Sequence, residues 1–79
     1  MKIISLNIRG LGGTLKRNYL RDLISKEHVD MVCLQQTKCY CFRREKVFLL
    51  WGCNEVNWVE NKVLNSASGV LTMWSNKSF

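Results

Sequence analysis

The amino-acid sequence predicts a small α/β unit, because two apolar segments typical of β-strands flank one amphipathic segment typical of an α-helix. The strand-like segments are residues 2–8 and 29–36, and the helical segment between them covers residues 15–27. A strand, a helix and a second strand within about 35 residues form a βαβ unit. We therefore predict that the two strands lie parallel and that a right-handed crossover joins them. The 79 residues suffice for one small domain.

The first strand and the helix each show an apolar pattern. Ile4, Leu6 and Ile8 alternate with polar residues, and Ile3 interrupts the alternation, as in a mostly buried strand. Glycines at positions 10, 12 and 13 then break the chain, and Thr14 is the predicted N-cap of the helix. The apolar residues that recur at helical spacing are Leu15, Tyr19, Leu20, Leu23 and Ile24.

The second half of the sequence is less regular. Residues 40–50 are predicted to be helical or irregular, and two further strands are predicted near residues 56–59 and 68–74. Aromatic side chains stack on bases in proteins that bind single strands. We instead expect Trp51, Trp58 and Trp74 to pack in the core or at its rim, since Trp74 ends an apolar alternation.

The composition excludes an intrinsically disordered chain, because 47% of the residues are apolar and 10% are aromatic. The net charge is +6, and the excess of Lys and Arg lies within the first 50 residues. This bias suits binding to a polyanion such as nucleic acid. The opening segment is interrupted by Asn7 and Arg9 and lacks a cleavage pattern, and no apolar stretch reaches the roughly 20 residues of a membrane span. We expect a nuclear or cytoplasmic location rather than secretion, and no membrane partner.

The four cysteines leave two interpretations open. Cys39 and Cys41, together with Cys33, Cys53 and His28, could supply zinc ligands, although the familiar C-x₂-C spacing is missing. We expect reduced, mostly structural cysteines without a disulfide partner, because no secretory context is present. His28 is predicted to end the helix and to interact with its last carbonyl groups.

Two polar residues stand near the ends of the predicted parallel strands. Asn7 ends the first strand and Gln36 ends the second. Parallel strands finish at the same edge of a sheet, where open α/β sheets tend to build their sites. From spacing alone, the two side chains either cap loops or form part of a site.

The literal residues resemble a known family. Residues 5–13 read SLNIRGLGG and residues 30–38 read DMVCLQQTK. They resemble the amino-terminal part of the endonuclease/exonuclease/phosphatase superfamily, most of all the endonuclease domain of plant LINE-type retrotransposons, with its motifs W-N-x-R-G-L-G and P-D-I-x-x-L-Q-E-T-K. Residues 66–74, SASGVLTMW, and residues 50–52, LWG, are similar to later segments of that domain.

The resemblance implies a fold and a chemistry. The complete fold of the family is a four-layered α/β sandwich, and residues 1–79 resemble its first third, a partial domain. Family members hydrolyse phosphodiesters with Mg²⁺, which prefers hard oxygen ligands that include one or two carboxylates. By resemblance, Asn7 helps to position the phosphate and the metal, and Gln36 stands where the family has its metal-binding glutamate. Gln36 keeps an oxygen but lacks the charge, so we expect weak Mg²⁺ binding and a vestigial catalytic role for Asn7.

The basic residues have two interpretations. Lys16 and Arg17 fall on the polar side of the predicted helix, and such charges usually form a solvated face. The functional interpretation is contact with DNA phosphates, which gives weak, salt-sensitive and sequence-independent affinity. The residues that we assign to this contact are Arg9, Lys38, Arg43, Arg44 and Lys46.

The functional prediction is a truncated, catalytically inactive fragment of a Mg²⁺-dependent DNA endonuclease of retrotransposon type. The later catalytic motifs of the family, its aspartates and its histidine, have no counterpart in the 79 residues. The alternative is a small basic module that binds nucleic acid without catalysis. A third possibility is a chain without a selected function.

Overall fold

The computed structural model describes residues 1–10, 13–37, 42–62 and 69–77, and within them it forms a mixed sheet with two helices. The elements are β1 (Ile3–Asn7), α1 (Thr14–Lys26), β2 (Met31–Gln35), α2 (Arg44–Trp51), β3 (Val56–Lys62) and β4 (Gly69–Ser75). The predicted strands and the predicted helix are all present with slightly shifted ends, and residues 44–51 form a helix in the segment predicted to be helical or irregular. The α/β class is confirmed.

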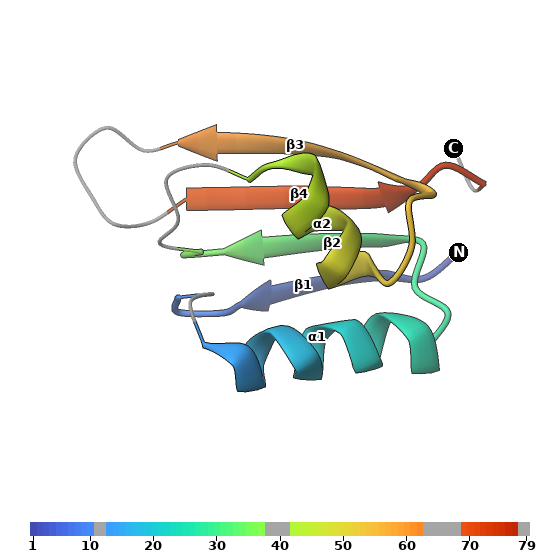
Figure 1. Cartoon of the computed structure of the whole chain (residues 1–79), viewed down its shortest axis with the longest axis horizontal. Helices are drawn as coiled ribbons and strands as arrows, with labels where there is room; N and C mark the ends of the chain where they lie inside the picture. The colour runs from blue at the N-terminus through green and yellow to red at the C-terminus, as the bar shows by residue number, and fades with distance from the viewer. Residues whose placement is uncertain (11–12, 38–41, 63–68, 78–79) are drawn as a thin grey trace.

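The sheet places β4 between β2 and β3, in the order β1-β2-β4-β3 (Figure 1). β1 and β2 are parallel, with Ile3 opposite Met31 and Asn7 opposite Gln35, which confirms the predicted parallel pair. β4 is antiparallel to both of its neighbours. β1, β2 and β3 therefore all finish at one edge of the sheet, which lies on the left in Figure 1 and which we call the carboxyl edge. Because β1 is an outer strand, its residues are at most half-buried, and the prediction of a mostly buried strand was wrong.

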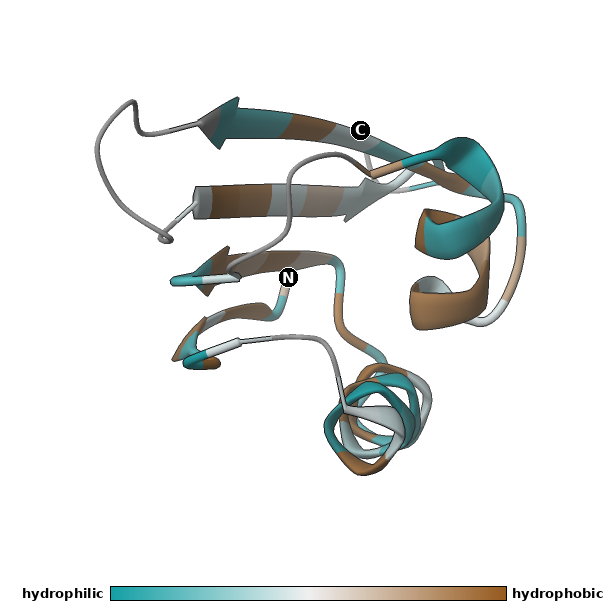
Figure 2. Cartoon of the chain, turned by 60° about the vertical axis from the view of Figure 1, so that its left-hand side comes forward, coloured by the Kyte–Doolittle hydropathy of each residue, from teal (hydrophilic) through white to brown (hydrophobic). Residues whose placement is uncertain are grey.

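Both helices pack on the same face of the sheet (Figure 2). The side chains buried between them are apolar, and each contributes about 1.5–3 kcal/mol by leaving water. Trp51 belongs to this core, and Trp58 packs at its rim against Phe48 in an edge-to-face pair with ring centroids 6.3 Å apart. The buried core residues are Leu20, Ile24, Val29, Val32, Leu34, Phe42, Val47, Leu50, Trp51, Val56, Leu71 and Met73.

The other face of the sheet, which we call the open face, carries no helix of the described chain (Figure 2). Its residues form three cross-strand rows: Ile3, Met31, Trp74 and Asn57; then Ser5, Cys33, Thr72 and Val59; then Asn7, Gln35, Val70 and Asn61. None of them is charged, although the chain has a net charge of +6. Trp74 is half-buried on this face because strand alternation places it opposite to Met73, so the prediction that it packs in the core or at its rim was wrong.

Helix α1 differs from its prediction at its start and on its surface. Gly13, not Thr14, is the N-cap residue, and Thr14 already has helical geometry. Leu20 and Ile24 are buried, but Leu15 is 86% exposed and Tyr19 is 60% exposed, so the apolar stripe is narrower than the sequence indicated. Neither α1 nor α2 is long and apolar enough to cross a membrane, and no other helix occurs in the described ranges.

Helix α1 is terminated by His28, which lies just beyond the C-cap residue Glu27 and has the left-handed conformation, at φ 51°. The N–H of Val29 donates to the carbonyl oxygen of Ile24 at 3.2 Å, and the N–H of Glu27 donates to that of Leu23 at 3.0 Å. This backbone pattern matches the common left-handed helix ending, in which glycine is the usual residue. His28 therefore ends the helix as predicted, but through its backbone conformation.

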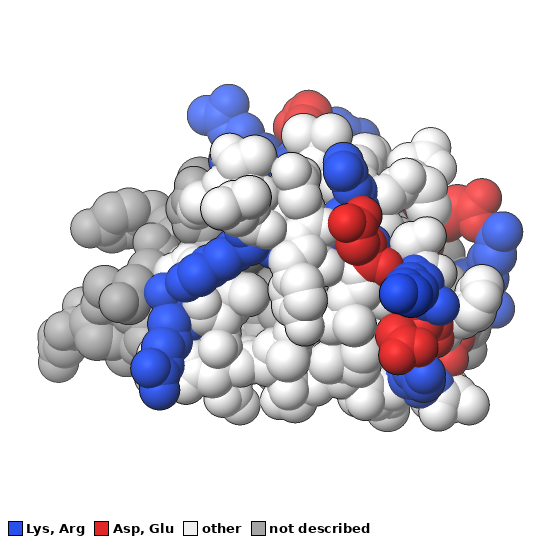
Figure 3. Space-filling model, turned by 90° about the horizontal axis from the view of Figure 1, so that it is seen from below, with Lys and Arg blue, Asp and Glu red and all other residues white. Residues whose placement is uncertain are grey.

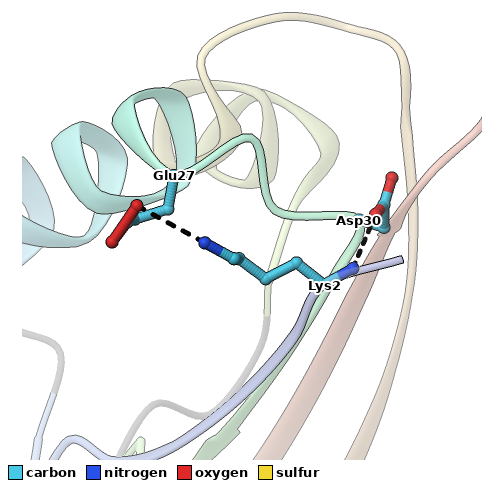
Figure 4. Close-up of polar contacts among 3 residues, drawn as sticks. All are labelled: Lys2, Glu27 and Asp30. Atoms are coloured by element: carbon cyan, nitrogen blue, oxygen red, sulfur yellow. Dashed lines mark hydrogen bonds and ion pairs between the residues drawn. The ribbon is translucent and has the colours of Figure 1, made fainter.

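Acidic residues gather where β1 and β2 begin. The backbone N–H of Lys2 donates to Asp30 at 2.8 Å, and its ammonium group lies 3.4 Å from Glu27 (Figure 4). At the same edge, Glu55 pairs with Lys77 at 3.0 Å and raises the pKa of Lys77 through a hydrogen bond and charge attraction. At the edge opposite the carboxyl edge, lysine ammonium groups thus pair with glutamate carboxylates, and these contacts stabilise the fold.

Candidate functional site

The candidate site lies at the carboxyl edge, where the segment after β1 meets the segment after β2. The N–H of Ile8 donates to the carbonyl oxygen of Gln35 at 3.0 Å, and the N–H of Gly10 donates to that of Gln36 at 2.7 Å. These two bonds extend the parallel pairing beyond both strands. They bring the segments of Asn7 and Gln36 side by side at one edge.

The polar side chains that stand together at this edge are three amides, those of Asn7, Gln35 and Gln36. Asn7 and Gln35 are cross-strand neighbours on the open face, and Gln36 follows directly after the end of β2. All three are exposed, and within the described ranges no side-chain hydrogen bond joins Asn7 to Gln36. The sequence interpretation had missed Gln35. Its position opposite Asn7 could have been inferred from the alternation of side chains along β2.

The backbone at this edge is strained in both segments. Arg9 has φ 50° and Gln36 has φ 57°, values that are uncommon for residues other than glycine, and Gly10 has φ 100°. Each such non-glycine residue costs on the order of 1–2 kcal/mol. Strained residues cluster at functional sites, where surrounding hydrogen bonds hold them in place. Here the bond from Gly10 to Gln36 links the two left-handed positions directly.

Lys16 holds the turn after β1 in place. Its ammonium group donates to the carbonyl oxygens of Ile8 at 3.0 Å and Arg9 at 3.2 Å, reaching back from the first turn of α1. Lys16 was predicted to belong to a solvated face or to contact DNA. The structure shows a third role, in which its charge stabilises the turn that carries Arg9.

Thr37 anchors the segment after β2. It is the residue after Gln36, only 1% of its surface is exposed, and its N–H donates to the carbonyl oxygen of Gly69 at 3.1 Å. Gly69, the first residue of β4, therefore holds Thr37 in place, and through it the backbone of the adjacent Gln36. Nothing in the spacing of the sequence indicated this contact, because it joins residues 32 positions apart.

The donor set at the carboxyl edge does not fit Mg²⁺ well. Residues 7–10 and 35–37 offer amide, hydroxyl and backbone oxygens, but no carboxylate. Mg²⁺ sites in proteins normally include one or two carboxylates. Among the described residues, no three of His, Cys, Asp and Glu come together in a group that could hold a metal. Of the residues considered for zinc, Cys39 and Cys41 lie outside the described ranges, and Cys33 and Cys53 are free thiols.

The predicted DNA-binding cations are divided between the edge and α2. Arg9 is exposed at the carboxyl edge, and Arg43 and Arg44 are exposed at the start of α2. Lys46 lies one turn further along, with its ammonium group 5.3 Å from the centre of the Phe42 ring. Lys38 lies outside the described ranges.

The charge distribution distinguishes the two ends of the molecule. In Figure 3, described Lys and Arg side chains lie without acidic neighbours at the left, which is the carboxyl edge, whereas both signs mix at the right. A surface of one sign attracts a polyanion and raises its rate of encounter. The arrangement can therefore hold phosphate groups, but it offers no charged general base and no strong metal ligand in residues 7–10 and 35–37.

Comparison with known proteins gives a partial match. No family model matches the sequence. A stretch of 39 residues is 51% identical to the zebrafish (Danio rerio) protein named DNA repair nuclease APEX1. The match covers 49% of this chain and 12% of the zebrafish protein. The partial match supports the resemblance to the endonuclease/exonuclease/phosphatase superfamily.

Proposed function

We propose that this chain is a nuclease-type unit that binds DNA at the carboxyl edge without cleaving it. The observation that carries the proposal is the pair of linked left-handed residues, Arg9 and Gln36, which present a cation and an amide at an edge without carboxylates. Such an edge attracts a phosphodiester through charge and hydrogen bonds. Similarity to a protein named as a DNA repair nuclease supports DNA as the polyanion.

Cleavage is not expected, because the chemistry needs groups that these residues do not offer. Phosphodiester hydrolysis requires a nucleophilic water and a base that orients and deprotonates it. In metal-dependent cleavage, the bound ion neutralises charge on the phosphate and the leaving oxygen. A neutral glutamine at position 36 cannot supply the charge that holds such an ion. The one histidine, His28, lies at the opposite end of α1 from the carboxyl edge.

The retrotransposon origin is a finer part of the proposal. Its support is the literal similarity of residues 5–13, 30–38 and 66–74 to motifs of plant LINE-type endonucleases. A basic nucleic-acid-binding module without nuclease ancestry is the second candidate, favoured by the concentration of positive charge in the first 50 residues. The two candidates differ in where DNA binds. The first requires the carboxyl edge, and the second requires only a basic surface.

A salt-dependent binding titration tests the proposal. We expect fluorescence anisotropy of a labelled duplex to show weak binding with a steep loss of affinity as salt rises. Arg9→Gln should reduce the slope of log affinity against log salt by about 0.9, which corresponds to one phosphate contact. The matched control is Lys26→Gln, which removes the same charge from the far end of α1 and should leave the slope unchanged. Equal effects of the two variants would refute an edge-specific site.

A further inference from the structure

A groove between the two helices is a second feature with the character of a binding site. It has a volume of about 230 Å³ and lies apart from Asn7 and Gln36. Its walls come from one stripe of each helix, because the lining residues repeat at intervals of three and four. They are Thr14, Arg17, Asn18 and Arg21 of α1 with Lys46, Leu49 and Leu50 of α2.

The groove is lined by three cations and by no acidic residue. Arg17 and Arg21 stand one helical turn apart, and like charges at this spacing repel each other. Neither arginine has a carboxylate within 4.0 Å in the described part of the chain. Repulsion among these positive charges raises the free energy of the groove when no anion is bound. A bound anion would lower that free energy, because it attracts all three cations.

Arg17 provides a second and independent indication. Its Nε atom is buried and has no hydrogen-bond partner among the described residues. Its Nη2 atom makes only a long contact of 3.5 Å with the hydroxyl oxygen of Thr14. A buried donor without an acceptor costs free energy, so native proteins rarely leave one unpaired. The guanidinium fork matches the paired oxygens of a phosphate group.

The size of the groove limits the ligand. Pockets that enclose drug-sized molecules or nucleosides have volumes of about 300–1,000 Å³, which exceeds this groove. A groove of this size accommodates a single phosphate group with part of its hydration shell. Leu49 and Leu50 supply an apolar wall, which strengthens charge attraction inside the groove.

We propose that the groove between α1 and α2 binds one phosphate group through Arg17, Arg21 and Lys46. The group belongs either to the backbone of a nucleic-acid strand or to free phosphate, since both offer the same oxygens. The assignment of the phosphate group to a nucleic-acid strand rests on the proposed DNA binding. Binding of free phosphate does not depend on that proposal.

The test uses the whole 79-residue chain and NMR of the arginine Nε–Hε groups. Titration with inorganic phosphate should shift the Arg17 signal, and Arg21→Gln should weaken this binding about tenfold through loss of one charge-assisted contact. Lys26→Gln is the charge-matched control, because it lies on α1 outside the groove and should bind phosphate as the wild type does. Arg17→Lys keeps the charge but loses the paired donors of the guanidinium group, so it should also bind more weakly.

The outcomes separate this site from the one at the carboxyl edge. An oligonucleotide that displaces phosphate from the groove identifies the strand as the ligand, whereas binding of phosphate without displacement identifies the free anion. Arg9→Gln should leave the phosphate shift at Arg17 unchanged even where it weakens DNA binding. No shift of Arg17 with phosphate, or the same loss in Lys26→Gln as in Arg21→Gln, would overturn the proposal.

Discussion

Replacing Gln36 with glutamate tests whether one missing charge explains the poor fit of Mg²⁺ at the carboxyl edge. Gln36 is exposed, and its backbone is held by the bond from Gly10 at 2.7 Å and by the neighbouring bond from Thr37 to Gly69 at 3.1 Å. Glutamate has nearly the same shape as glutamine, so Gln36→Glu should change the charge at this position and little else. The strain of the left-handed conformation applies equally to both residues.

The size of the effect follows from the exposure of the site. A pair of unit charges 4 Å apart interacts by about 1 kcal/mol in water and about 4 kcal/mol at an effective dielectric constant near 20. A divalent ion doubles these values, and exposure favours the lower one, so we expect a gain of about 2 kcal/mol. This corresponds to an affinity for Mn²⁺ or Mg²⁺ that is about 30-fold higher than in the wild type.

Electron paramagnetic resonance of free Mn²⁺ measures this affinity directly. Asn61→Asp is a matched control, since it makes the same amide-to-carboxylate change at the end of β3, two strands from β2 and about 10 Å away. We expect Asn61→Asp to bind Mn²⁺ no better than the wild type. An equal gain in both variants, or tight binding by the wild type, would refute the assignment of position 36 as the deficient metal ligand.

Three further outcomes are expected. The chain should associate at micromolar concentration through its uncharged open face, and Val59→Lys should shift its elution in size exclusion toward that of the monomer. A wild-type chain that elutes as a clean monomer and melts cooperatively above about 60 °C would contradict this. His28→Gly should raise the melting temperature measured by circular dichroism by about 4–8 °C, because glycine removes about 1 kcal/mol of left-handed strain; a lower melting temperature would show that the imidazole makes a stabilising contact. Replacing Arg43, Arg44 and Lys46 together with alanine should flatten the salt dependence of DNA binding, and an unchanged slope would exclude α2 from the interface.

The local pattern of the sequence was sufficient to predict the βαβ unit. The strand in residues 2–8 and the helix in residues 15–27 form largely through interactions between residues close in sequence. Apolar periodicity is a reliable signal of such local structure. The parallel pairing then followed from topology alone. It placed Asn7 and Gln36 at the same edge, where the structure has them.

Features that depend on distant contacts could not be predicted. Insertion of β4 between β2 and β3 and the outer position of β1 are both decided by pairing between distant segments of the chain. Alternation in β4 shows that Met73 and Trp74 point to opposite faces but does not say which face the helices cover. The cationic groove likewise depends on the packing of α1 against α2, although the spacing of Arg17 and Arg21 is visible in the sequence.

Capping also shows the limit of local reasoning. Thr14 has the residue type of an N-cap, yet Gly13 occupies that position and its carbonyl oxygen accepts the N–H of Arg17 at 3.2 Å. The hydroxyl group of Thr14 instead lies 3.5 Å from the guanidinium group of Arg17. Side-chain preference at helix ends is worth about 1 kcal/mol, which the surrounding turn can override. In this chain, that turn is fixed by Lys16.

Plasmid nicking in Mg²⁺, at protein concentrations that saturate DNA binding, tests the central claim most directly. The wild type and Gln36→Glu should both leave supercoiled plasmid intact while bound to it, because a restored metal ligand does not supply the base that activates water. The double variant Asn7→Ala, Gln36→Glu controls for contaminating nuclease. Nicking by the wild type or by Gln36→Glu that disappears in the double variant would show that the carboxyl edge is a working catalytic site, and the account of a binding unit without cleavage would be wrong.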